Sequence, residues 1–153
     1  MNIHFVCTGN TFRSRLAEAY TASLVDLKDH HISSSGILAS YYRFQNGPVN
    51  WYTMRLIANY HLIPHMSFDS TNTTSDLLKR ADLIIFMKQE HFDYAKENLG
   101  FEGSNYQIWN IPDLNEMPGF SATKPNEDLY IKLTEEIYDS IKLNVDNLVK
   151  SIT

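Results

Sequence analysis

The segment FVCTGNTFRSR, residues 5–15, brings a nucleophile together with groups that bind an anion. Its Cys7 is the only cysteine of the chain, and Arg13 stands six residues later, with a glycine and an asparagine between them. A cysteine thiolate is a strong nucleophile, and an arginine guanidinium matches two oxygens of a phosphate. Gly9 permits close approach of the backbone, and Asn10 tolerates the left-handed conformation that a tight loop needs. The spacing therefore predicts a phosphate-binding loop with a nucleophile at its base.

The rest of the chain alternates strand-like apolar runs with helix-like segments. Residues 2–7 are typical of a short buried strand, and apolar residues recur at helical spacing from Ser14 onward. Further strands are expected at 31–35, 81–87 and 106–110, and further helices at 48–60, at 75–80, in the segment ending near 98 and over about twenty residues near the C-terminus. The segment 37–47 is expected to form a loop. This alternation predicts a single α/β domain over residues 1–153, with a doubly wound, four-stranded parallel sheet and helices on both faces.

In such a fold the turn from the first strand into the first helix lies at the carboxyl edge of the sheet, where ligands bind. The first turn of the helix offers unpaired N–H groups and the positive end of its dipole. These groups are expected to bind a phosphate and to stabilise the thiolate of Cys7. The predicted phosphate-binding residues, besides Arg13, are Thr8, Gly9, Asn10, Thr11, Phe12 and Ser14.

The composition is that of an ordinary globular protein, with 43% hydrophobic and 20% charged residues. The formal net charge of −5 disfavours nucleic acid as a partner, and no apolar run approaches the roughly 20 residues of a membrane helix. The N-terminus lacks the pattern of a signal peptide, and a chain with one cysteine suits a reducing compartment. We therefore expect a cytoplasmic protein. None of the six histidines forms a metal-binding pattern, so no metal or other cofactor is expected.

The loop and several other segments resemble the low-molecular-weight protein tyrosine phosphatases. Residues 6–14, VCTGNTFRS, are similar to the family signature, a valine followed by Cys-x-Gly-Asn-x-Cys-Arg-Ser near the N-terminus. Residues 16–19, LAEA, resemble the start of the first helix of the family, and residues 34–36, SSG, resemble its Ser-Ala-Gly segment. Residues 81–87, ADLIIFM, are similar to its third strand. The resemblance extends over nearly the whole chain.

The resemblance implies a role for each of three residues. Cys7 would attack phosphorus and form a phosphocysteine intermediate, and Arg13 with the loop N–H groups would stabilise the phosphoryl oxygens. An aspartate between the last strand and the last helix would protonate the leaving group and then activate water. Asp113, in the segment 109–114, occupies the matching place. Glu116 is the reserve candidate for this acid.

Several details of the loop follow or depart from the family pattern. Asn10, Ser14 and Ser34 resemble a hydrogen-bond network that supports the phosphate-binding loop, although serines also cap helices and fill turns. Phe12 stands where relatives usually carry a second cysteine, so the disulfide that protects their nucleophile cannot form. Arg15 replaces a usual proline.

The wall of the substrate pocket is less well defined by the sequence. The loop after Asp113 lacks the adjacent aromatic residues that are common in the family. Either Tyr41, Tyr42 and Phe120 supply this wall or the pocket is unusually open; ordinary loop packing explains the two tyrosines equally well. Thr11 resembles the branch that hydrolyses phosphoarginine, because tyrosine-directed relatives more often carry isoleucine there.

The expected substrate is therefore a phosphorylated protein or peptide, with inorganic phosphate and similar anions as product or inhibitors. Phosphotyrosine is favoured and phosphoarginine is the alternative. A binding module that holds phosphate or a phosphoprotein without turnover is an alternative of another class. Arsenate reductases share the loop, but they relay electrons through additional cysteines, which this chain lacks.

Overall fold

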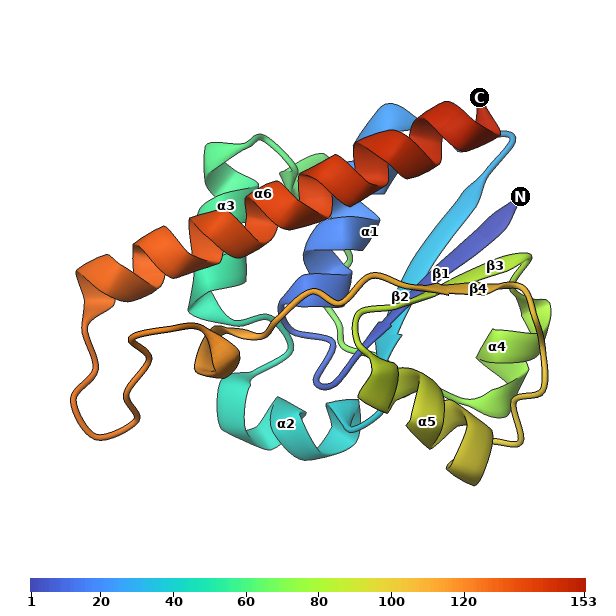
Figure 1. Cartoon of the computed structure of the whole chain (residues 1–153). Coiled ribbons are helices and arrows are strands. Elements are labelled where there is room, and N and C mark those ends of the chain that lie inside the picture. Colours follow the sequence, from blue (N-terminus) through green and yellow to red (C-terminus); the bar gives the residue numbers. More distant parts are fainter.

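The computed structural model describes residues 1–153 apart from the side chain of residue 46, and its centre is a four-stranded sheet (Figure 1). The strands are β1 (Asn2–Cys7), β2 (His31–Gly36), β3 (Leu83–Phe86) and β4 (Tyr106–Ile108). They lie in the order β2-β1-β3-β4, and each neighbouring pair is parallel. The predicted α/β fold with a four-stranded parallel sheet is confirmed. Because the strands are parallel, their carboxyl ends meet at one edge of the sheet.

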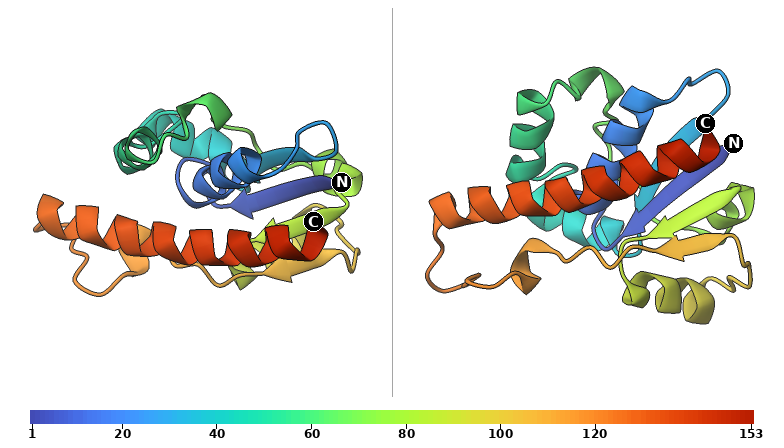
Figure 2. Two further views of the ribbon diagram at one scale, coloured as in Figure 1. Left: turned by 90° about the horizontal axis from the view of Figure 1, so that it is seen from above. Right: turned by 45° about the horizontal axis from the view of Figure 1, so that its top comes forward.

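Helices cover both faces of this sheet, as parallel strands require. The helices are α1 (Arg13–Leu24), α2 (Ala39–Asn46), α3 (Trp51–Asn59), α4 (Ser75–Arg80), α5 (Gln89–Asn98) and α6 (Glu127–Ile152), with short 3₁₀ turns η1 (Ile63–His65) and η2 (Leu114–Glu116). On one side α1 packs against α6, and α3 contacts both. On the other side α4 contacts β1 and α5 contacts β3. Figure 2 shows α6 running along the length of the molecule. Over the described residues, no helix is both long and apolar enough to cross a membrane.

The two cores follow from the alternation of side chains along each strand. Ile3, Phe5 and Cys7 point into the core that the sheet shares with α1, α3 and α6. Val6 and Phe86 point into the smaller core beneath α4 and α5. β1 is therefore buried on both faces, and its last residue, Cys7, is only 3% exposed.

The connection between β2 and α3 differs from the prediction. The segment 37–47, expected to be a loop, contains the helix α2, which is followed by Gly47 as its C-cap. The next helix, expected from residue 48, begins only at Trp51, because the side chain of Asn50 caps it by accepting a hydrogen bond from Thr53 N at 2.8 Å. This displacement places the start of α3 beside the loop that follows β1, since Asn50 N donates to Thr11 O at 3.3 Å.

Candidate active site

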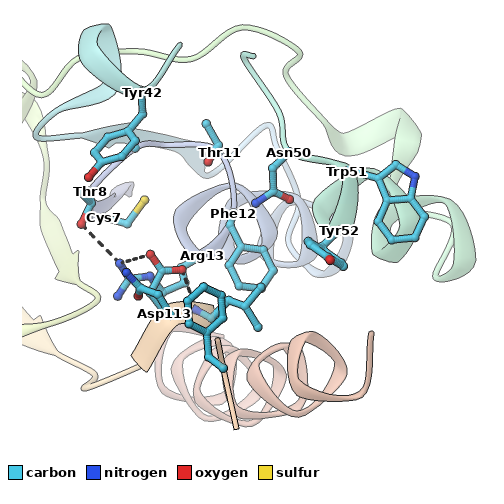
Figure 3. Close-up of a pocket in the computed structure, with 14 residues that line it drawn as sticks. Cys7, Thr8, Thr11, Phe12, Arg13, Tyr42, Asn50, Trp51, Tyr52 and Asp113 are labelled. Carbon is cyan, nitrogen blue, oxygen red and sulfur yellow. Dashed lines mark hydrogen bonds and ion pairs between the residues drawn. The ribbon is translucent and has the colours of Figure 1, made fainter. Parts of the chain in front are cut away.

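A pocket of about 470 Å³ opens at the carboxyl edge of the sheet, over the loop between β1 and α1 (Figure 3). Its lining residues are Cys7, Thr8, Gly9, Thr11, Phe12, Arg13, Tyr42, Asn50, Trp51, Tyr52, Asp113, Leu114, Asn115 and Phe120. The structure thus brings the three predicted catalytic residues, Cys7, Arg13 and Asp113, to one pocket. α1 begins at Arg13 without a capping side chain, so no side chain of the loop occupies the N–H groups of its first turn.

The sulfur of Cys7 lies among hydrogen-bond donors at the base of this loop. The backbone N–H of Asn10 donates to Cys7 Sγ at 3.3 Å, and Ser14 Oγ lies 2.9 Å from the same sulfur. Ser14 Oγ accepts a hydrogen bond from Asn10 Nδ2 at 2.8 Å, which leaves its own proton free for the sulfur. Donors that converge on a thiolate stabilise its negative charge.

Asn10 holds the loop in shape from below. It is fully buried and has a φ of 55°, in the left-handed region that asparagine tolerates. Its Nδ2 also donates to Ser34 Oγ at 2.9 Å, and its Oδ1 accepts from Thr71 N at 2.9 Å. Ser34 in turn donates to Glu18 Oε2 at 2.6 Å. Burial raises the pKa of Glu18, although the hydrogen bond from Ser34 and the nearby charge of Arg15 oppose this shift.

Arg15 is a supporting residue whose role the sequence analysis missed. It is 1% exposed, and its guanidinium donates to the backbone oxygens of Ser67 and Asp69. Its Nη1 also lies 3.5 Å from Asn10 Oδ1. The guanidinium therefore ties the polar segment before α4 to the loop. The sequence feature that could have indicated this role is an arginine directly before the apolar residues of a helix that packs on the sheet.

Gly36 is a second missed residue, at the end of β2. A Cβ atom at this position would lie 2.6 Å from Asn10 N and from Thr8 O. Real Cβ atoms do not approach backbone this closely, so only glycine lets β2 pass directly beneath the loop. The sequence feature that could have indicated this role is a glycine at the end of a strand-like run of serines.

Arg13 links the two sides of the pocket. It is 2% exposed, and its Nη1 donates to Ile111 O at 2.9 Å. Its Nη2 lies 3.4 Å from Thr8 Oγ1 and 3.6 Å from Asp113 Oδ2 (Figure 3). One edge of the guanidinium is thus anchored to the protein, and the other faces the space where an anion would bind.

The two candidate acids lie in different surroundings. Asp113 lines the pocket; its Oδ1 accepts from Leu114 N at 2.9 Å, while its Oδ2 faces Arg13. Glu116 does not line the pocket, because it accepts from Asp113 N at 3.0 Å and pairs with Lys88. Burial alone would raise the pKa of Glu116, but the hydrogen bonds from Lys88 and Asp113 outweigh it and lower the pKa. Of the two carboxylates, only that of Asp113 is aimed at the pocket.

Aromatic residues form the outer wall. Tyr42 and Phe120, both considered from the sequence, line the pocket, and α3 adds Trp51 and Tyr52, which the sequence analysis missed. Tyr41 does not line the pocket; it is 60% exposed and packs edge-to-face on Tyr42, with ring centroids 5.1 Å apart. The extra aromatic residues come from the displaced start of α3.

The buried histidines make hydrogen bonds within the protein. His4 lies between two hydroxyls, with Nδ1 2.7 Å from Ser33 Oγ and Nε2 2.7 Å from Ser35 Oγ. Burial lowers the pKa of His4 to about 4. Within the described residues, no three His, Cys, Asp or Glu side chains come together to hold a metal ion.

Comparison with known proteins places this site in a family. A model of the family described as low molecular weight phosphotyrosine protein phosphatase matches residues 2–153. The chain is 29% identical over 143 residues to the low molecular weight protein-tyrosine-phosphatase PtpB of Staphylococcus aureus, covering 92% of this chain and 94% of that protein. It is 32% identical over 102 residues to the protein-arginine-phosphatase of Bacillus subtilis (strain 168), covering 65% of this chain and 64% of that protein.

A solved structure shows the same fold. The YwlE arginine phosphatase, in a C7S mutant with a phosphorylated active-site serine, matches with a TM-score of 0.68 and 22% identity. The match covers 98% of this chain and 97% of that one. The family match itself spans nearly every residue of the chain. The chain belongs to the low molecular weight phosphotyrosine protein phosphatase family and is a phosphatase.

Proposed function

We propose that this phosphatase removes phosphate from phosphotyrosine in proteins or peptides through a phosphocysteine intermediate on Cys7. The observation that carries the proposal is the convergence of Cys7, Arg13 and Asp113 on one pocket. A nucleophile, a cation and a carboxyl group are the three functions that a two-step phosphoryl transfer needs.

In the first step the thiolate of Cys7 attacks phosphorus, and the bond between phosphorus and the leaving oxygen breaks. Arg13 and the N–H groups at the start of α1 bind the three phosphoryl oxygens as charge redistributes among them. Asp113, in its protonated form, gives its proton to the leaving oxygen. The products of this step are a phosphocysteine, a free alcohol or phenol, and an ionised Asp113.

In the second step water attacks the phosphocysteine. The Asp113 carboxylate takes a proton from the water, the sulfur–phosphorus bond breaks and inorganic phosphate leaves. The N–H of Asn10 and the hydroxyl of Ser14 stabilise the departing thiolate. The phosphorylated serine in the YwlE mutant supports this covalent step, because there the residue that replaces a cysteine carries the phosphate.

The lining of the pocket supports phosphotyrosine as the substrate. Tyr42, Trp51, Tyr52 and Phe120 line the pocket, and aromatic side chains pack well against a phenyl ring. The Staphylococcus aureus relative, which aligns over most of this chain, is a protein-tyrosine-phosphatase.

Phosphoarginine is the second candidate substrate, and Thr11 is the observation that favours it. Thr11 lines the pocket and is 7% exposed. Its backbone oxygen accepts a hydrogen bond from Thr53 Oγ1 at 2.6 Å, which holds the backbone of the loop at this residue. A hydroxyl oxygen can accept a hydrogen bond from a guanidinium, and the Bacillus subtilis relative is a protein-arginine-phosphatase.

A parallel assay on matched phosphotyrosine and phosphoarginine peptides tests the proposal. We expect the higher kcat/KM on phosphotyrosine, and we expect Thr11→Ile to raise the ratio of phosphotyrosine to phosphoarginine turnover. A higher kcat/KM on the phosphoarginine peptide would identify phosphoarginine as the preferred substrate. Binding of inorganic phosphate without release of phosphate from either peptide or from p-nitrophenyl phosphate would indicate a binding module.

A further inference from the structure

Two nitrogen groups converge on the hydroxyl of Thr8, the residue after the nucleophile. His91 Nε2 lies 2.9 Å from Thr8 Oγ1, and Arg13 Nη2 lies 3.4 Å from it (Figure 3 shows the second contact). Thr8 lines the pocket, whereas His91 lies behind it at the start of α5 and is fully buried. The mechanism described above makes no use of either side chain.

The protonation of His91 follows from its second contact. The backbone N–H of Lys88 donates to His91 Nδ1 at 3.0 Å, so Nδ1 is an acceptor and carries no proton. The proton of the neutral ring is therefore on Nε2, which donates to Thr8. Glu90 Oε1, 3.7 Å from Nε2, also favours a proton there. Burial and the charge of Arg13 lower the pKa of His91 to about 3, so the ring stays neutral at ordinary pH.

Of the hydrogen-bonding groups of the Thr8 hydroxyl, only the proton consequently remains available. A hydroxyl has two acceptor lone pairs and one proton. Donors from His91 and Arg13 occupy the lone pairs, and within the described residues these are its only hydrogen-bond contacts. Its proton is left without a protein acceptor, on a side chain that lines the pocket.

We propose that the Thr8 hydroxyl donates a hydrogen bond to a phosphoryl oxygen of the bound substrate, and that His91 is the positioning residue that sets this direction. The proposal rests on the proposed function, because it requires a phosphoryl group in the pocket. Thr8 thus adds a side-chain donor to the backbone N–H groups and guanidinium that bind the anion.

This proposal gives the two threonines of the loop, Thr8 and Thr11, different roles. Because both lone pairs of Thr8 are occupied, its hydroxyl cannot accept a hydrogen bond from the guanidinium of phosphoarginine. It serves the phosphoryl group that both candidate substrates share. Loss of this hydroxyl should therefore weaken the binding of inorganic phosphate and lower turnover of both peptides by the same factor. Thr11 remains the residue at which the loop can distinguish between the substrates.

A pair of substitutions at each position tests the proposal by calorimetric titration of inorganic phosphate. Thr8→Val, which keeps the shape but removes the hydroxyl, should weaken phosphate binding by roughly 10–100-fold, the usual effect of a hydrogen bond to a charged group. Thr8→Ser should retain most of the affinity. His91→Asn keeps the acceptor for Lys88 N but lacks the donor at the Nε2 position, and it should weaken binding in the same direction. His91→Gln carries an amide that reaches toward the Nε2 position and should restore binding.

The combined variant separates positioning from a general structural effect. Thr8→Val with His91→Asn should bind phosphate no more weakly than Thr8→Val alone, because His91 acts through Thr8. Additive losses would overturn the positioning role, and normal affinity in Thr8→Val would overturn the whole inference, since Thr8 is only partly buried and this variant is expected to fold. Wild-type protein that binds phosphate without turnover would remove the proposed function but leave this test intact. Wild-type protein that does not bind phosphate would overturn both.

Discussion

The guanidinium of Arg13 lies 3.6 Å from the carboxylate of Asp113, measured from Nη2 to Oδ2. Arg13 begins the helix after β1, and Asp113 follows β4, so this ion pair joins two distant segments across the pocket. Arg13 is buried, whereas the side chain of Asp113 is 38% exposed. A phosphate dianion that enters the pocket competes for the same guanidinium. Binding of the substrate should thus release the carboxyl group toward the leaving oxygen.

The role of Asp113 is tested by the dependence of rate on the leaving group. Asp113→Asn should slow hydrolysis of phenyl phosphate by about 10²–10⁴-fold, the usual range for a lost acid–base catalyst. The loss in the burst phase with p-nitrophenyl phosphate should be smaller, because nitrophenolate leaves with little help. Glu116→Gln is the matched control and should have a much smaller effect, since Glu116 caps η2 outside the pocket. An equal, small loss for both leaving groups would mean that Asp113 only shapes the loop.

Cys7→Ser should abolish turnover and keep phosphate binding. The serine hydroxyl remains protonated and is a poor nucleophile, whereas the N–H groups at the start of α1 survive the change. Hydrolysis of p-nitrophenyl phosphate and calorimetric binding of phosphate measure the two effects separately. Residual activity within about tenfold of wild type, a difference of only about 1.4 kcal/mol in the barrier, would remove Cys7 from the mechanism.

Gly36→Ala should distort the phosphate-binding loop from beneath. The added Cβ would lie 2.6 Å from Asn10 N and Thr8 O, so one of the two segments must shift. Overpacking of this kind costs about 1–3 kcal/mol, and we expect a lower Tm together with weaker phosphate binding. Gly100→Ala is a control, because its φ of 67° also strains an alanine but nothing lies within 4 Å. That control should lower the Tm without changing phosphate affinity, and equal affinity in both variants would contradict the prediction.

The two buried histidines should make the protein sensitive to acid. Burial lowers the pKa of His4 to about 4 and of His91 to about 3, against an ordinary value of 6.5. Below pH 6.5 the unfolded chain takes up protons that the folded chain does not, until pH reaches the folded values. The contribution of each neutral histidine to the free energy of unfolding should therefore be fully present above pH 6.5. Below that pH, the free energy of unfolding should fall by up to about 1.4 kcal/mol per pH unit for each histidine.

Urea unfolding between pH 4 and 7.5 measures this slope. The double variant His4→Asn with His91→Gln lacks both titrating rings and should show a shallower dependence on pH than wild type. The comparison removes the contribution of the carboxylates, which both proteins share. Identical slopes would show that the histidines are not held neutral by the fold.

Oxidation should inactivate the enzyme progressively. Cys7 is the only cysteine, so its sulfenic acid cannot be trapped as a disulfide within the chain. Recovery of activity by a thiol reductant should decline as exposure to peroxide lengthens and sulfinic acid accumulates, which mass spectrometry detects. Phe12 is buried in the same core as Cys7, and Phe12→Cys should prolong recovery by supplying a resolving thiol; Phe12→Ala should not. Full recovery of the wild-type monomer after long exposure would contradict this.

The sequence by itself determined the elements whose contacts are local. The helix that starts at Arg13 and the loop before it could be predicted, because their hydrogen bonds join residues only a few positions apart. The strand that ends at Cys7 could be predicted from its apolar run, although its hydrogen bonds reach the distant strands β2 and β3. The alternation of strands and helices also gave the parallel sheet, since hydrophobic periodicity records which faces are buried. The helix α2 was missed because the polar and aromatic residues of 37–47 lack a clear apolar stripe.

Only the tertiary structure decided which distant residues reach the loop. His91 contacts Thr8 from the start of α5, and the guanidinium of Arg15 reaches the backbone of Ser67 and Asp69. The aromatic wall likewise depends on where α3 begins, which the cap at Asn50 sets. A periodic pattern shows that a side chain is buried but does not identify its partner. Those partners are chosen by the order of the strands and the packing of the helices against them, and both are properties of the folded chain.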